Sequence, residues 1–137
     1  MPRPIVLQIN KGALRRNLAR MREAARGRFL WAVVKADAYG HGLLNALDAF
    51  AEADGLCTIE VRDAVLFREN GWRKPVLMLE GFFDASDVRG LEAYGIETNV
   101  HSLGQVEMLE AMAPFKRLQV RVKVNSGMNR LGFPPAE

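Results

Sequence analysis

Cysteine is nearly absent from this sequence, because Cys57 is the single cysteine among 137 residues. One cysteine cannot form a disulfide within the chain, and it cannot supply the ligand set of a cysteine-bound metal site. Cys57 lies in a short apolar segment, so we interpret it as a small packed hydrophobic residue. The sequence therefore excludes a fold that is held together by disulfides or by a cysteine-bound metal.

Long apolar runs are also missing. The N-terminal residues MPRPIVLQINKGALRR contain an apolar stretch of only about five residues, which is shorter than the core of a signal peptide. No window approaches the roughly 20 apolar residues that a membrane-spanning helix needs. Low-complexity tracts are absent, and 49% of the residues are hydrophobic against 26% charged, which indicates an ordered chain. We therefore expect a soluble cytoplasmic protein.

Acidic residues are outnumbered by basic ones, with 16 Asp and Glu against 19 Lys and Arg. The densest basic run lies on and just after one amphipathic segment and consists of Arg15, Arg16, Arg20, Arg22, Arg26 and Arg28. No aromatic residues are interleaved with these arginines, although nucleic-acid sites use aromatic side chains to stack on bases. We interpret the run as a solvent-exposed helix face and expect no nucleic-acid partner.

Hydrophobic periodicity divides the chain into alternating strands and helices. Short apolar runs predict strands over residues 5–9, 29–34, 56–59, 76–79, 96–100 and 118–124. The segments between them carry apolar residues at the three- and four-residue spacing of a helix face. Asp84 and Ser102 have the spacing of capping boxes, Gly71 and Gly95 can end helices, and Pro114 stops the last one. Strand and helix alternate about every 20 to 25 residues, which indicates βα units and a parallel sheet.

The alternation alone does not distinguish a doubly wound sheet from a barrel. In the last predicted strand, LQVRVKVN, the valines face one side while Arg121 and Lys123 face the other. The polar side then faces either the lumen of a barrel or, at an edge strand, water. A full barrel needs eight βα units and roughly 250 residues, so five units make an incomplete barrel. Because the chain also stops at the turn-like segment FPPAE, we expect it to be a piece of a longer protein.

Lys35 follows the apolar run FLWAVV directly, at the end of a βα unit where barrels carry their active residues. Desolvation and nearby cations lower the pKa of an amine, and a neutral amine can attack an aldehyde. Tyr39, Gly40 and Gly42 come next, and backbone N–H groups with a phenol hydroxyl could hold a phosphate there. From these residues alone, Schiff-base chemistry competes with an ordinary strand-end lysine and βα loop.

Two motifs carry a resemblance to a known family. AVVKADAYGHG, residues 32–42, resembles the pyridoxal-phosphate lysine motif of alanine racemases, and VKVNSGMNRLGF, residues 122–133, resembles their second signature. The motifs stand in the expected order, and the resemblance runs from MPRP to FPPAE. The form NSGMNRLGF, with Asn125 where many relatives have aspartate, resembles the branch common in Gram-negative bacteria, which includes catabolic enzymes.

The resemblance implies an α/β fold, the N-terminal portion of a (β/α)8 TIM-like barrel with about five of its eight strands. Residues 11–137 would form barrel strands and helices, and residues 1–10 would give a strand to a C-terminal β domain that is absent here. The family enzyme is a homodimer with active sites at the subunit interface. Its second base, a tyrosine of the other subunit, and the arginine that faces the pyridine nitrogen do not lie in these residues. We therefore expect the chain alone to be inactive.

The resemblance also implies residue roles in the racemisation of L- and D-alanine, which supplies D-alanine for peptidoglycan or catabolises it. Lys35 would bind pyridoxal 5'-phosphate as a Schiff base and exchange the α-proton on the D-alanine side, and Tyr39 would hydrogen-bond the cofactor phosphate. Arg130 would bind near the substrate carboxylate and the phenolic oxygen of the cofactor. Lys123 matches a lysine that is carbamylated in many members. No metal is implied.

Two other functions stay open on the same residues. One is a racemase for serine or another small amino acid, and the other is a non-catalytic pyridoxal-phosphate-binding barrel protein, against which NSGMNRLGF speaks. The remaining candidates favour structural interpretations: His41 and His101 pack loops, and Met128 and Leu131 pack the loop that presents Arg130. Asp37 either braces its loop or is a solvated carboxylate.

Overall fold

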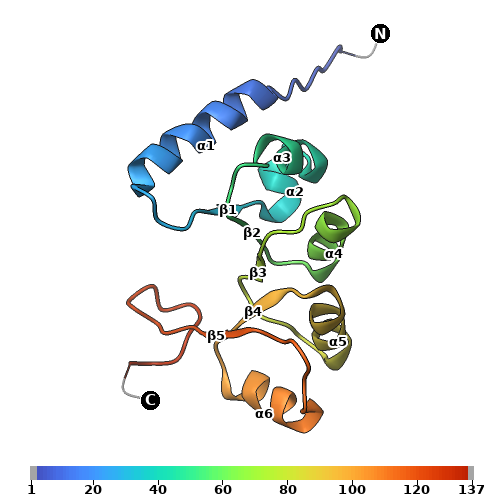
Figure 1. Cartoon of the computed structure of the whole chain (residues 1–137), viewed down its shortest axis with the longest axis vertical. Coiled ribbons are helices and arrows are strands. Elements are labelled where there is room, and N and C mark those ends of the chain that lie inside the picture. The colour runs from blue at the N-terminus through green and yellow to red at the C-terminus, as the bar shows by residue number, and fades with distance from the viewer. Residues whose placement is uncertain (1–2, 136–137) are drawn as a thin grey trace.

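Five parallel strands alternate with helices along residues 3–135, the part of the chain that this computed structural model describes (Figure 1). The strands are β1 (Trp31–Val33), β2 (Gly55–Thr58), β3 (Val76–Met78), β4 (Glu97–Val100) and β5 (Val120–Val122). Their order in the sheet is their order in the chain, β1-β2-β3-β4-β5, and every pairing is parallel. This arrangement confirms the predicted series of βα units and leaves β1 and β5 as the two edges of the sheet.

The helices settle the choice between the two candidate architectures. They are α1 (Lys11–Ala25), α2 (Lys35–Gly40), α3 (Leu43–Ala49), α4 (Val61–Glu69), α5 (Ala85–Tyr94) and α6 (Leu103–Met112). Figure 1 shows α2 to α6 along the same side of the strands. A doubly wound sheet carries helices on both faces, whereas a barrel carries them only outside. The structure is therefore that of part of a barrel.

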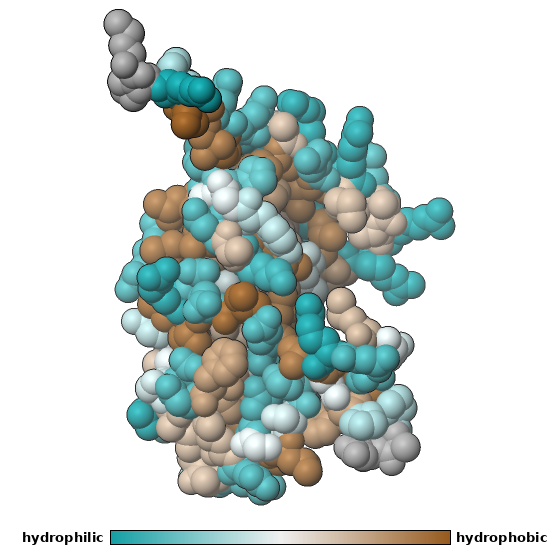
Figure 2. Space-filling view, turned by 180° about the vertical axis from the view of Figure 1, so that it is seen from behind, coloured by the Kyte–Doolittle hydropathy of each residue, from teal (hydrophilic) through white to brown (hydrophobic). Residues whose placement is uncertain are grey.

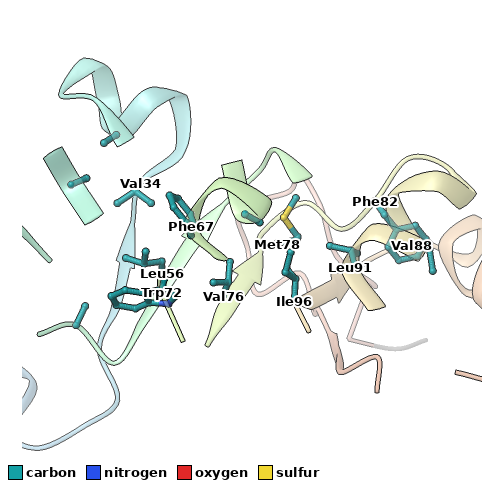
Figure 3. Packing of buried hydrophobic residues seen from close by; sticks show 14 of the residues in the cluster. Val34, Leu56, Phe67, Trp72, Val76, Met78, Phe82, Val88, Leu91 and Ile96 are labelled. Carbon is teal, nitrogen blue, oxygen red and sulfur yellow. The ribbon is translucent and has the colours of Figure 1, made fainter. Parts of the chain in front are cut away.

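The core lies between the sheet and these helices. Strand residues that point outward meet apolar helix and loop residues, and Figure 3 shows ten of the cluster with labels: Val34, Leu56, Phe67, Trp72, Val76, Met78, Phe82, Val88, Leu91 and Ile96. Because side chains alternate along a strand, the other face of the sheet is concave and stays separate from this core. Cys57 lies on that concave face and is 2% exposed.

The predicted helix ends depend on local hydrogen bonds. Oδ1 of Asp84 accepts from the backbone N–H groups of Ser86 and Asp87 at 2.7 and 2.9 Å, and Gly95 ends α5 in the left-handed conformation. The predicted capping box after β4 is not formed, because Gln105 bonds one residue before the N-cap Ser102. Oε1 of Gln105 accepts from the backbone N–H of His101 at 2.9 Å, but the side chain of Ser102 makes no capping hydrogen bond.

The prediction of a strand over residues 5–9 is wrong for this structure. Residues 3–10 form neither helix nor strand, and Ile5, Val6 and Leu7 are 91%, 85% and 79% exposed. A strand needs a hydrogen-bonded neighbour, and none lies beside this segment in the described part of the chain. That the segment joins a β domain stays a prediction.

Two arginines on the arginine-rich face of α1 form ion pairs with carboxylates of neighbouring segments. Arg22 donates to both carboxylate oxygens of Asp54 at 3.0 and 3.1 Å, and Arg15 donates to Asp48 at 2.9 Å. These ion pairs join α1 to α3 and to the start of β2. Five of the six arginines of this run, Arg15 included, are exposed and Arg22 is half-buried, so the prediction of a solvent-exposed face is confirmed for the run as a whole.

The outer face of β5 is largely uncovered. Val120, Val122 and Val124 are 43%, 70% and 52% exposed, and they line a hollow of about 640 Å³ together with Val100 and Phe133. Figure 2 shows apolar patches between hydrophilic residues on the back of the molecule. None of the helices within residues 3–135 has the length and apolar character that a membrane crossing requires.

Candidate active site

Lys35 directly follows the buried end of β1. Val34 is 1% exposed, and its backbone N–H donates to the carbonyl of Cys57 on β2 at 2.8 Å, which fixes the start of the following loop. Lys35 itself is half-buried, and no hydrogen bond or ion pair engages its amine within residues 3–135. The structure thus confirms the predicted place of Lys35 at the carboxyl end of the first strand.

The backbone after Lys35 forms a left-handed turn. Ala36, Asp37, Ala38 and Tyr39 all have φ of 53 to 54° and ψ of 40 to 53°. Each residue with a Cβ pays about 1–2 kcal/mol in this conformation. Strained backbone of this kind is found mainly at functional sites. None of these four positions is a glycine, so nothing in the sequence indicated a left-handed turn.

Two hydrogen bonds to residues before and after the left-handed turn hold it in place. The backbone N–H of Ala38 donates to Val34 at 2.9 Å, and Oδ1 of Asp37 accepts from the backbone N–H of Leu43 at 2.8 Å. Asp37 therefore braces the loop, as one of its two interpretations stated. Nδ1 of His41 lies 2.8 Å from the carbonyl of Ala38, so this exposed histidine makes a hydrogen bond within the loop.

The other histidine candidate has a structural place as well. Nε2 of His101 lies 2.9 Å from the carbonyl of Glu80, and Nε2 of Gln105 donates to the carbonyl of Phe82 at 3.1 Å. These contacts fix the loop after β3 against the start of α6. The interpretation of His101 as a loop-packing residue is therefore confirmed.

The second motif forms a closed loop after β5. Its ends are joined by backbone hydrogen bonds of 2.9 Å, from the N–H of Phe133 to Lys123 and from the N–H of Asn125 to Phe133. Gly132 has φ of 112°, and a Cβ there would lie 2.6 Å from the backbone nitrogen of Asn125, so only glycine fits. The loop carries Arg130 at its exposed side.

One packing prediction in this loop is wrong. Met128 is 75% exposed, so its side chain does not pack the loop. Leu131 is half-buried, in agreement with the prediction. Backbone closure and polar side chains, rather than a small apolar cluster around Met128, therefore give the loop its shape.

Lys35, Lys123 and Arg130 lie beyond the carboxyl ends of β1 and β5, the two edge strands of one parallel sheet. The three residues therefore share one end of the sheet. No hydrogen bond or ion pair joins them within residues 3–135, so the structure places them at the same end without bringing them into contact. Tyr39, on the left-handed turn, is 59% exposed and accessible to a ligand.

The available groups suit an aldehyde with a phosphate and a substrate with a carboxylate. Lys35 offers an amine that has no partner among residues 3–135, Tyr39 a phenol, and Arg130 a guanidinium. Within the described residues, no group of three or more histidine, cysteine and carboxylate side chains could hold a metal ion. Burial raises the pKa of the Cys57 thiol to about 12, so this cysteine is a packed residue, as predicted, and no nucleophile at neutral pH.

All the comparisons with known proteins point to the same family. The model of the alanine racemase N-terminal domain matches residues 9–137. The alanine racemase of Erwinia tasmaniensis is 49% identical over 137 residues, which are 100% of this chain and 38% of that protein. A catabolic alanine racemase of Klebsiella aerogenes is 47% identical over 135 residues, 98% of this chain and 38% of that protein.

A solved structure shows the same fold. The biosynthetic alanine racemase from Pseudomonas aeruginosa superposes with a TM-score of 0.89 at 34% identity, over 93% of this chain and 36% of that one. The chain thus spans 38% of the length of the curated relatives named above.

Proposed function

Because the chain belongs to the alanine racemase family through its N-terminal domain, we propose that the intact protein interconverts L- and D-alanine with pyridoxal phosphate. The family is one of pyridoxal-phosphate-dependent enzymes. The observation that carries the proposal is Lys35, a half-buried amine without a partner among the described residues, followed by a strained turn that presents Tyr39.

Each site residue has a stated role in this proposal, and Lys35 has two. Lys35 holds the cofactor through Nζ and carries the α-proton on the D-alanine side. Tyr39 donates a hydrogen bond to the cofactor phosphate from its exposed phenol. Arg130 binds the substrate carboxylate, which a planar guanidinium does through two parallel hydrogen bonds. When bound, pyridoxal phosphate withdraws electrons from the α-carbon.

We further propose that the intact protein is a homodimer whose partner subunit supplies the second proton carrier. A racemase exchanges the proton on both faces of the α-carbon, so a second acid–base group is needed opposite Lys35. The chain contains two tyrosines, Tyr39 and Tyr94. Tyr94 is the last residue of α5, which leads into β4, so it lies at the opposite end of the sheet from Lys35. Tyr39 already has its proposed role at the cofactor phosphate and Tyr94 lies at the far end of the sheet, so we propose that the partner subunit supplies this group.

The test is racemisation by the intact protein with two lysine variants. Wild type supplied with pyridoxal phosphate should convert each alanine enantiomer into the other, faster than it converts serine. Lys35→Ala should lose both the absorbance of the bound cofactor and turnover. Lys116→Ala is the matched control, because Lys116 is exposed and lies outside both motifs. Borohydride reduction and peptide mapping should place the pyridoxyl group on Lys35, and finding it on Lys123 would refute the assignment.

A further inference from the structure

The side-chain amide of Asn125 lies inside the loop that carries Arg130, where it makes three hydrogen bonds. Its Oδ1 accepts from the backbone N–H groups of Gly127 at 3.1 Å and of Asn129 at 3.0 Å. Its Nδ2 donates to Oδ1 of Asn129 at 2.9 Å. Both ends of one amide therefore hold the loop from within.

Other contacts hold the loop only at its base. The backbone bonds between Lys123, Asn125 and Phe133 close the two ends, while Met128 and Arg130 at the tip are exposed. Asn129, directly before Arg130, has φ of 57° in the left-handed region, which asparagine adopts more readily than most L-residues do. Its backbone N–H and its Oδ1 both bond to the side chain of Asn125. The conformation of the residue next to Arg130 thus depends on its bonds to Asn125.

We propose that Asn125 is a positioning residue for Arg130, and that Asn125 and Asn129 form an amide pair that tolerates one carboxylate but not two. The proposal rests on the proposed function, because the role of Arg130 comes from it. An amide can donate or accept, so an aspartate at either position still finds a donor in the other residue, once the amide of Asn129 rotates where needed. Two aspartates only accept, and at this distance two carboxylates repel.

Loss of the amide pair can be distinguished by experiment from a general effect of added negative charge near Arg130. Asn125→Asp and Asn129→Asp each add one negative charge, and the double variant adds two. Asn125→Asp with Ser126→Asp also adds two charges, but Ser126 is exposed and its side chain makes no hydrogen bond within the described residues. That second double variant is therefore the charge-matched control.

The experiment measures kcat/KM for alanine in the intact protein with its cofactor bound. Both single variants and the control should stay within about threefold of wild type. Asn125→Asp/Asn129→Asp should lose about tenfold or more, because the side-chain hydrogen bond between residues 125 and 129 is replaced by repulsion between two carboxylates, which opens the loop and displaces Arg130. Cofactor absorbance should stay in all of them. The loss should shrink from pH 8 to pH 6, because two facing carboxylates come to share a proton.

Amide hydrogen exchange gives a second measurement that does not need turnover. The backbone N–H groups of Gly127 and Asn129 should be protected in wild type, in the single variants and in the control, and should lose protection in Asn125→Asp/Asn129→Asp. Retained protection in that double variant would overturn the amide pair. Lost protection with wild-type kcat/KM would overturn the positioning of Arg130. If the wild-type protein does not racemise alanine, the proposed function and the positioning role both fall, and exchange alone decides whether the pair holds the loop.

Discussion

The guanidinium carbon of Arg121 on β5 lies 5.4 Å from the centre of the Trp31 ring on β1. These two strands are the opposite edges of the sheet, so their side chains can meet only if the sheet curls toward its concave face. Nε of Arg121 also donates to Oε2 of Glu97 at 2.9 Å. The polar side of the last strand therefore faces the lumen of an incomplete barrel. Of the two possibilities that the sequence left open for this side, the barrel lumen and water at an edge strand, the structure supports the lumen.

Gly55 is expected to be essential for the position of Trp31. A Cβ at Gly55 would lie 2.3 Å from the indole ring, so Gly55→Ala forces the ring out of place. We expect a loss of about 1–3 kcal/mol in the free energy of unfolding, the usual cost of overpacking. Urea denaturation of the intact protein without cofactor measures it.

Two further variants test this explanation. Gly104→Ala is the control, because nothing lies within 4 Å of its Cβ position on α6, and it should be neutral or slightly stabilising. Trp31→Leu should make Gly55→Ala less costly, since the clash then disappears. Equal costs of Gly55→Ala in both backgrounds would show that the indole is not the cause.

The left-handed turn predicts that one alanine-to-glycine change stabilises the protein. Ala36 is exposed and has φ of 53°. Ala36→Gly removes steric strain of about 1–2 kcal/mol from the folded state. The added conformational freedom of the unfolded chain costs about 0.5–1 kcal/mol. A net gain of up to about 1.5 kcal/mol follows in urea denaturation without cofactor. Ala93→Gly, at an exposed position in the helix α5, should destabilise by about 0.5–1 kcal/mol. A loss at both positions would mean that Ala36 is not left-handed in solution.

The sequence predicted the order of the five sheet strands and their helices, the place of Lys35 and the helix end at Gly95. These features depend on local periodicity and on short caps, as at Asp84 and Gly95. It did not predict the left-handed turn, because the strain there is sustained by two hydrogen bonds: Asp37 accepts from the backbone N–H of Leu43, and the backbone N–H of Ala38 donates to Val34. It also overestimated the strand over residues 5–9, since an apolar alternation gives a strand only where another strand supplies hydrogen bonds.

The ion pair of Arg22 and Asp54 gives the stability of the protein a dependence on pH. Hydrogen bonds from Arg22 and from the backbone N–H of Leu30 hold the pKa of Asp54 below its usual value of 3.8. A carboxyl whose pKa is lower in the folded state stabilises the protein above its unfolded pKa, and this contribution is lost as the pH falls through the folded pKa. Asp54→Asn should therefore lower the urea midpoint at pH 7, and its difference from wild type should vanish toward pH 2 to 3. Glu107→Gln on the exposed face of α6 is the control, and a pH-independent difference for Asp54→Asn would contradict the ion pair as its cause.

Lys123 is expected to carry a carbamate in the intact protein. Lys123 is half-buried, and its amine has no hydrogen bond or ion pair within residues 3–135. Its backbone is fixed, because its N–H donates to the carbonyl of Val100 and its carbonyl accepts from the N–H of Phe133. Carbon dioxide adds to a neutral amine, with a new N–C bond and release of one proton, and the resulting anion could hold the guanidinium of Arg130.

The carbamate can be observed directly with labelled bicarbonate. Protein incubated with carbon-13 bicarbonate should show one additional carbamate resonance, which Lys123→Ala removes and Lys116→Ala keeps. Lys123→Ala should also lower kcat/KM for alanine by about tenfold, because Arg130 loses an anionic neighbour, and a short carboxylic acid should restore part of it. A resonance that survives Lys123→Ala would place the carbamate elsewhere. The absence of any resonance in an active enzyme would mean that Arg130 is held by protein groups alone, foremost the loop that Asn125 closes.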